Sequence, residues 1–169
     1  AAIAALKGPL HGGANEQVMK TLKSIGSVSR AESFIQSKLD SKEKIMGFGH
    51  RVYKNGDPRA KHLREMSKQL SEYAGNATWY EMSVLIDKLV VEKKGILPNV
   101  DFYSASVYSY LGIDEDIFTP IFAMSRITGW TAHIMEQYAN NRLIRPRAEY
   151  TGPINQRYVS IAQRGTVTL

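Results

Sequence analysis

Residues 47–59 of this 169-residue chain read GFGHRVYKNGDPR, a stretch that joins a glycine loop to a helix start. Glycine lacks a Cβ atom, so the backbone on either side of His50 can come close to a ligand. Asp57 and Pro58 are typical of a helix N-terminus, because Asp is a favoured N-cap and Pro fits the first helical position. Arg59 then lies in the first turn, at the helix end that carries partial positive charge. The stretch therefore predicts a helix that begins at Pro58 and an anionic ligand beside His50 and Arg59.

The hydrophobic spacing outside this stretch predicts an all-α fold. Apolar residues recur three and four positions apart in several segments, which is typical of helices with one buried face. Gly26, Gly95 and Gly112 are expected to end three of these helices. We expect helices to begin near Asn15, Ser29, Pro58, Thr78, Asp101 and Pro120.

Side-chain caps are expected at several of these helix starts. Asn15 is a candidate cap for the first helix, and Ser29 with Glu32 forms the pattern of a capping box. Asp101 lies in a loop before an apolar segment, and a plain N-cap is the commonest role of such an Asp.

Packing is expected to follow the apolar stripes. The helix after Pro58 should bury Leu63, Met66 and Leu70, which lie at helical spacing. The helix after Pro120 is the most apolar in the chain. The tail beyond it is expected to be an irregular arm with one short strand at residues 158–161.

Composition excludes several classes of protein. The formal net charge is +6, and residues 142–169 contribute five arginines against one glutamate. Because no basic stripe with interleaved aromatic residues is present, we expect small anions or a second subunit as partners and no nucleic acid. No apolar run reaches about 20 residues, so no membrane span is expected. The chain has no cysteine, which excludes disulfides and is compatible with a cytoplasmic protein.

Two of the four histidines lie in glycine-flanked turns, and these are the candidate catalytic histidines. His11 belongs to the segment GPLHGG at residues 8–13, and His50 to the stretch already described. The positive end of a following helix favours a neutral imidazole, which can donate a hydrogen bond to a developing oxyanion. An ordinary turn histidine is the alternative for each. His62 and His133 are interpreted as surface or core histidines of their helices.

Two arginines outside the first stretch are also candidates. Arg126 lies in the most apolar helix, and a buried guanidinium needs an anion, which is either an internal carboxylate or a dicarboxylate ligand. Arg145 precedes Pro146 in the tail and is either a solvated charge or part of a site. The spacing of histidines and carboxylates does not indicate metal ligands, so no metal is expected.

Five segments together resemble the citrate synthase family, specifically the group of bacterial citrate synthases and 2-methylcitrate synthases. Residues 47–59 match the family's signature at every constrained position. GPLHGGAN is similar to its first catalytic-histidine turn, PNVDFYS to its aspartate loop, and SRITGW and RPR to its two later arginine sites. These four segments occupy residues 8–15, 98–104, 125–130 and 145–147, in the family's order.

The resemblance implies a condensation of acetyl-CoA with oxaloacetate, followed by hydrolysis of citryl-CoA to citrate and CoA. Asp101 would take a proton from the methyl group of acetyl-CoA, and His11 would stabilise the enolate. His50 would polarise the ketone of oxaloacetate, while Arg59 and Arg126 would bind its carboxylates.

The remaining contacts implied by the resemblance involve CoA and a second subunit. Arg145 would reach into the neighbouring site of a homodimer, with a hexamer as the alternative assembly. No cofactor is implied, because acetyl-CoA is a substrate. The CoA contacts would be Met46, Gly47, Phe48, Gly49, Arg51 and Lys54.

The resemblance also divides the chain into parts of two domains. Residues 1–12 would end a large-domain segment, residues 13–112 would form the small domain, and residues 113–169 would return to the large domain with its C-terminal arm. The chain lacks an initiator Met and a signal peptide, as a cytoplasmic piece of a longer enzyme would, and such a piece is expected to be inactive alone. Two alternatives remain: a 2-methylcitrate synthase that uses propionyl-CoA, since FYSA at residues 102–105 occurs in both groups, and a non-catalytic helical binding module.

Overall fold

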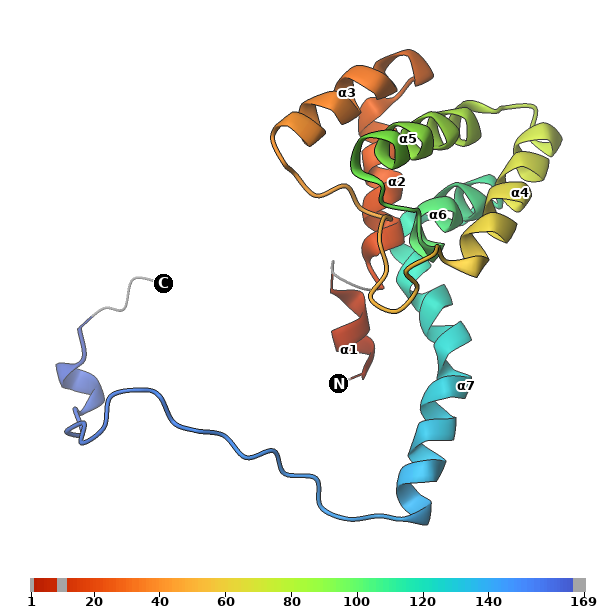
Figure 1. The fold of residues 1–169 in the computed structure, drawn as a ribbon. Coiled ribbons are helices and arrows are strands. Elements are labelled where there is room, and N and C mark those ends of the chain that lie inside the picture. The colour runs from red at the N-terminus through yellow and green to blue at the C-terminus, as the bar shows by residue number, and fades with distance from the viewer. Residues whose placement is uncertain (1, 9–11, 166–169) are drawn as a thin grey trace. The chain divides into compact units, whose positions relative to one another are not determined.

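The computed structural model describes residues 2–8 and 12–165. The described residues form helices and connecting segments, which confirms the all-α prediction (Figure 1). The α-helices are α1 (Ala2–Lys7), α2 (Ala14–Ile25), α3 (Val28–Asp40), α4 (Pro58–Tyr73), α5 (Thr78–Lys94), α6 (Val100–Tyr110) and α7 (Phe118–Ala139), and the 3₁₀ helices are η1 (Glu115–Ile117) and η2 (Ile161–Gln163).

Several predicted boundaries are confirmed. Asp57 caps α4 and Pro58 occupies its first turn, since the Asp57 carboxylate accepts a hydrogen bond from the Arg59 backbone N–H. Gly26 and Gly95 end α2 and α5 in the left-handed conformation that glycine adopts without strain. Helix α1 was not predicted from the sequence.

Two predicted caps are wrong, and one helix begins earlier than predicted. Helix α2 begins at Ala14, so Asn15 lies inside it. Helix α3 begins at Val28 after Ser27, which places Ser29 within the helix and rules out the capping box. Helix α7 begins at Phe118 rather than Pro120, because η1 runs directly into it.

The tail contains no strand among its described residues, so the strand predicted at residues 158–161 is wrong. Ser160 is extended, but the chain then turns into the 3₁₀ helix η2, in which the Gln163 N–H reaches back to the Ser160 carbonyl. Residues 140–157 are likewise irregular, as expected of an arm.

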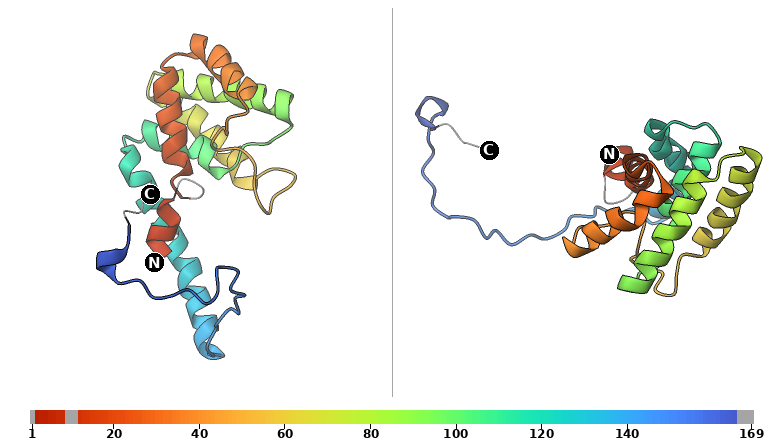
Figure 2. Two further views of the ribbon diagram at one scale, coloured as in Figure 1. Left: turned by 90° about the vertical axis from the view of Figure 1, so that its left-hand side faces the viewer. Right: turned by 90° about the horizontal axis from the view of Figure 1, so that it is seen from above.

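The chain divides into two compact units, residues 1–132 and residues 133–169. In the first unit, α3 packs on α5, and α2 and α4 both pack on α6, an arrangement visible in both further views (Figure 2). The core is built from apolar side chains of α2, α3, α5 and α6 together with Phe118 of α7. The domain limits inferred from the resemblance, at residues 12 and 112, stay a prediction.

The contact between α4 and α6 uses small residues, contrary to the prediction. Met66 is 46% exposed, and Leu63 and Leu70 are only partly buried, so they do not form the expected core stripe. The buried face of α4 instead carries Ala60, Ser67 and Ser71, and the Ser67 and Ser106 hydroxyl oxygens lie 2.8 Å apart. Small side chains let two helix backbones approach closely, which large apolar residues would prevent.

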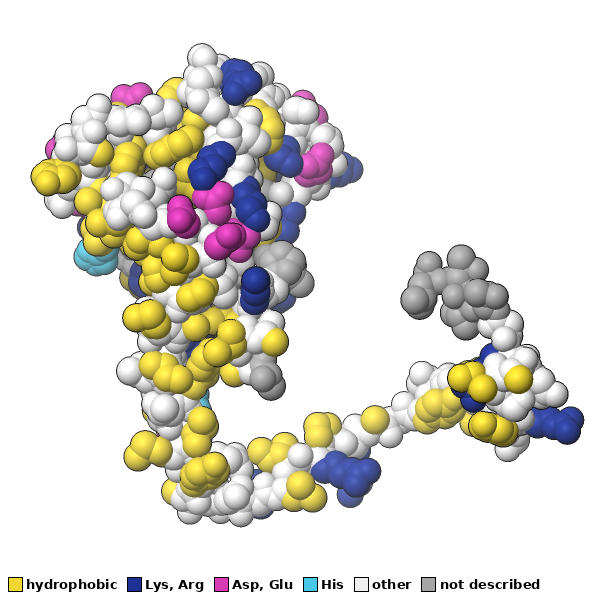
Figure 3. Space-filling view, turned by 180° about the vertical axis from the view of Figure 1, so that it is seen from behind, with side chains coloured by type: hydrophobic (Ala, Val, Ile, Leu, Met, Phe, Trp, Pro, Cys, Tyr) yellow, Lys and Arg dark blue, Asp and Glu magenta, His cyan; other side chains and the backbone are white. Residues whose placement is uncertain are grey.

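The apolar face of α7 is largely exposed within the first unit. Only Phe118 and Thr119 of this helix are buried, and Met124 is 73% exposed. Figure 3 shows hydrophobic side chains gathered along the helix surface. A groove of about 580 Å³ lies beside α7, with Ile3 of α1 and Trp130 among its walls. Despite this apolar face, no helix among the described residues is both long and apolar enough to cross a bilayer.

Candidate active site

Hydrogen bonds join the glycine loop that carries His50 to the loop before α6. The Gly49 N–H donates to the Leu97 carbonyl, and the Asn99 N–H donates to the Gly47 carbonyl, both at 2.9 Å. The Asn99 amide also donates to the Gly49 carbonyl at 2.8 Å. These bonds place His50 beside the first turn of α6, which carries Asp101.

The absence of a side chain at Gly47 allows the glycine loop to pack against α6. It has φ +85°, and a Cβ atom built on it would lie 2.9 Å from the Cα, Cβ and Cδ2 atoms of Phe102. Phe48 packs on the same ring, with centroids 4.5 Å apart. The glycine therefore lets the loop approach α6 closely.

The ring of His50 has a defined hydrogen-bonding pattern. Its Nδ1 atom accepts hydrogen bonds from the backbone N–H groups of Val52 and Tyr53, each at 3.0 Å. A nitrogen that accepts two hydrogen bonds carries no proton, so the neutral ring holds its proton on Nε2. His50 can thus present an N–H donor on the side of the ring that faces away from these amides.

Arg59 is held by the residue that caps its own helix. The Asp57 carboxylate accepts hydrogen bonds from Arg59 Nε at 2.9 Å and from Nη2 at 2.8 Å. Burial alone would raise the pKa of Asp57, but the hydrogen bonds from Arg59 outweigh it and hold that pKa below its ordinary value. Asp57 is therefore ionised at neutral pH, and the Arg59 guanidinium has a fixed orientation.

Asp101 lies in the first turn of α6 but does not cap it, so the sequence prediction of a plain N-cap is wrong. The cap is Asn99, whose side-chain oxygen accepts from the Asp101 N–H at 3.0 Å. The Asp101 carboxyl is therefore not used to cap the helix. Burial raises its pKa to about 6, against the lowering effect of Arg59 and with a smaller upward contribution from Asp57. A carboxylate with such a pKa is ionised at pH 7 and is still basic enough to take a proton.

Six of the predicted site residues line one pocket of about 420 Å³ in the first unit: Gly49, His50, Arg51, Arg59, Asp101 and Arg126. His50 comes from the glycine loop, Arg59 from α4, Asp101 from α6 and Arg126 from α7. The Arg126 guanidinium lies 5.4 Å from the centroid of the Phe122 ring and forms no ion pair with any described carboxylate. The internal ion pair that the sequence left open for Arg126 is therefore absent from the described residues. The full lining is Gly49, His50, Arg51, Arg59, Asn99, Val100, Asp101, Phe122 and Arg126.

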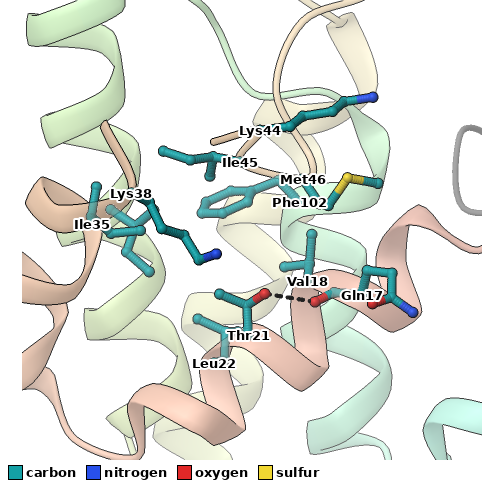
Figure 4. A pocket seen from close by; sticks show the side chains of 11 residues that line it. Gln17, Val18, Thr21, Leu22, Ile35, Lys38, Lys44, Ile45, Met46 and Phe102 are labelled. Carbon is teal, nitrogen blue, oxygen red and sulfur yellow. Dashed lines mark hydrogen bonds between the residues drawn. The ribbon is translucent and has the colours of Figure 1, made fainter. Parts of the chain in front are cut away.

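Of the remaining predicted site residues, those that the structure describes do not line this pocket. His11 is outside the described residues, and Arg145 is an exposed residue of the second unit. Lys54 is exposed on the loop after His50. Met46 lines a separate pocket of about 180 Å³ between α2, α3 and α6, where Lys38 and Lys44 also lie (Figure 4).

Sequence reasoning missed the supporting roles of Asp57 and Asn99. The sequence contained a signal for each residue. Both lie at a helix start, where a short polar side chain often folds back onto the backbone, and both lie two positions before a candidate site residue. Asn99 also bridges two loops, and no local pattern indicates that contact, because its partner Gly49 lies far away in the sequence.

Together, the fold and this pocket define an all-α protein in which an imidazole donor, a basic carboxylate and three arginines line one cavity. Residues 1–147 match the family described as "Citrate synthase, C-terminal domain", and the chain belongs to the citrate synthase family.

Named relatives and a solved structure agree with this assignment. Citrate synthase 2 of Bacillus subtilis (strain 168) is 68% identical over 164 residues, which cover 97% of this chain and 44% of the relative. The 2-methylcitrate synthase of Shewanella oneidensis is 46% identical over 163 residues, covering 96% of this chain and 44% of the relative. Citrate synthase from Thermoplasma acidophilum, solved with carboxymethyl coenzyme A and oxaloacetate, superposes with a TM-score of 0.82 at 41% identity over 95% of this chain and 44% of that one. The expected citrate synthase-like fold is thus confirmed, and the chain spans less than half the length of these relatives.

Proposed function

We propose that a polypeptide containing this chain is a citrate synthase, which condenses acetyl-CoA with oxaloacetate and hydrolyses citryl-CoA to citrate and CoA. The observation that carries the proposal is the convergence of His50, Arg59, Asp101 and Arg126 on one pocket. The 68% identity to a relative named citrate synthase 2 supports acetyl-CoA as the acyl substrate.

In this proposal, Asp101 is the base of the condensation. Its carboxylate takes a proton from the methyl group of acetyl-CoA, and the electron pair of the broken C–H bond passes into an enolate. His11 would donate a hydrogen bond to the thioester oxygen, where the negative charge of the enolate develops. A carboxylate whose pKa burial has raised to about 6 suits the first step, because it is ionised at neutral pH yet not stabilised by strong hydrogen bonds.

His50 and the two arginines would hold and activate oxaloacetate. The Arg59 and Arg126 guanidinium groups would each bind one carboxylate of the substrate, which fixes the ketone for attack. The Nε2–H of His50 would donate to the ketone oxygen and give it a proton as the methyl carbon bonds to the ketone carbon. Water then cleaves the thioester of citryl-CoA.

The site would be completed by segments beyond this pocket. Arg145 would come from a second subunit of a homodimer, and closure of the small domain of residues 13–112 on a large domain would exclude stray water. The nucleotide end of CoA would lie along residues 46–49, with Arg51 and Lys54 near its phosphates, and the pocket beside Met46 offers apolar walls and two lysines.

The decisive assay measures citrate formation by the full-length natural polypeptide that contains this chain, and by the 169-residue chain itself. Citrate from the longer polypeptide alone is the expected result. Turnover of propionyl-CoA with a higher kcat/KM than acetyl-CoA would make the protein a 2-methylcitrate synthase instead, the name carried by the relative at 46% identity. No condensation product from either thioester would leave a helical binding module.

A further inference from the structure

Asp57 is the most completely engaged buried carboxylate next to the pocket. Its side chain is fully buried, and its two oxygens accept four hydrogen bonds. Oδ1 accepts from the backbone N–H and from Nε of Arg59, at 3.0 and 2.9 Å. Oδ2 accepts from Nη2 of Arg59 at 2.8 Å and from the backbone N–H of Val100 at 3.0 Å.

The first consequence concerns Arg59. Its side chain is 44% exposed, so without a partner it would sample many rotamers in water. Asp57 occupies Nε and Nη2, and among the described residues Nη1 has no hydrogen-bond partner. The guanidinium therefore lines the pocket with one edge held by Asp57 and with Nη1 available. Because its side chain is already ordered in the free protein, ligand binding costs little additional conformational entropy.

The second consequence concerns the start of α6. The Val100 N–H is one of the donors at the N-terminus of α6 that have no partner within the helix, and it donates to Asp57, the N-cap of α4. One carboxylate thus joins the N-termini of two helices, one carrying Arg59 and the other carrying Asp101.

From this geometry we propose that Asp57 is a positioning residue for oxaloacetate binding: it does not touch the substrate but sets the Arg59 guanidinium and the first turn of α6 around it. The proposal rests on the proposed function, because oxaloacetate is the ligand that Arg59 would bind. A simple helix cap is the competing interpretation, and a cap needs only the bond from Oδ1 to the Arg59 backbone N–H.

The variant Asp57→Ser separates the two interpretations. Serine caps a helix about as well as aspartate, but its hydroxyl is too short to hold the guanidinium as well. Asn76→Ser is the matched control, since the Asn76 side chain accepts from the Thr78 N–H at 3.0 Å at the start of α5, away from the pocket. Each variant is made in the full-length polypeptide, and oxaloacetate binding is measured by calorimetry beside the thermal midpoint of unfolding.

We expect Asp57→Ser to weaken oxaloacetate binding about 10- to 100-fold, the range that corresponds to losing a hydrogen-bonded charged partner. The KM for oxaloacetate should rise more than the KM for acetyl-CoA. Arg59→Lys should weaken binding as well, and the double variant should bind no more weakly than the worse single variant, because both changes remove one arrangement. Asn76→Ser should leave oxaloacetate binding unchanged.

The proposal is overturned if Asp57→Ser binds oxaloacetate like the unmodified protein, or if the losses from Asp57→Ser and Arg59→Lys are additive. If Asp57→Ser does not fold, Asp57→Asn, which keeps the volume and the cap oxygen, is measured in the same way and decides the question. Failure of the unmodified protein to bind oxaloacetate would instead overturn the proposed function, and this inference with it.

Discussion

Replacing Gly47 by alanine tests the account of how the glycine loop is held against α6. Two separate costs arise from the added methyl group. The backbone at φ +85° would cost a residue with a Cβ about 1–2 kcal/mol. The Cβ would also lie 2.9 Å from three atoms of Phe102, two of which belong to a buried side chain and one to the helix backbone, so neither can move easily. Overpacking of this kind typically costs about 1–3 kcal/mol.

Gly47→Ala should therefore lower the free energy of unfolding by about 2–5 kcal/mol, the sum of these two ranges. Gly75→Ala is the matched control, because Gly75 also has positive φ, +62°, but an added Cβ there would meet nothing within 4 Å. The difference between the two variants isolates the contact with Phe102. Urea unfolding of both variants, followed by circular dichroism, gives that difference, and equal losses would refute the close packing of the loop on α6.

Asp101→Asn should remove most turnover and yet stabilise the protein at pH 7 by about 1–3 kcal/mol, because burial raises the pKa of Asp101 from 3.8 to about 6 and so disfavours the ionised native form. Denaturant titrations should show that this gain in stability vanishes below about pH 4, where the carboxyl is protonated in both the folded and the unfolded state. Tyr103→Phe should lower the free energy of unfolding by about 1–3 kcal/mol, because the Tyr103 hydroxyl donates a hydrogen bond to the buried Asp87 carboxylate at 2.6 Å. Thermal unfolding measures this loss, and no change would mean that Arg64 alone satisfies the Asp87 carboxylate. Arg145→Ala should impair oxaloacetate binding, and verified heterodimers with a subunit inactivated elsewhere should regain part of the activity; absence of any rescue would argue against a role in trans.

Local chemistry in the sequence was enough to predict much of the fold. Asp57 with Pro58 marked the start of α4, and Gly26 and Gly95 marked helix ends, because capping and left-handed glycine geometry depend on only a few neighbouring residues. The caps predicted at Asn15 and Ser29 were wrong, and other failures lie where tertiary contacts decide. Met66 was predicted to be buried by its spacing, but close packing of α4 on α6 selects the small side chains of the next face.

The sequence brought together several residues that line the candidate pocket, but it did not predict the contacts that hold them there. His50 and Arg59 stand out in one stretch, and the resemblance supplied Asp101 and Arg126 from distant segments. What the sequence could not supply is the way in which Asp57 and Asn99 hold these groups, since their hydrogen bonds join segments about 40 to 50 residues apart.

The proposed role of Asp101 is that of the base in a condensation in which His50 and the arginines hold oxaloacetate. One measurement checks this role: the full-length polypeptide, unmodified or as Asp101→Asn, is incubated with oxaloacetate and acetyl-CoA, citrate is identified, and release of the CoA thiol is followed. We expect citrate from the unmodified protein, and a folded Asp101→Asn variant that still binds oxaloacetate but releases almost no thiol. Near-normal thiol release by Asp101→Asn would exclude Asp101 as the base.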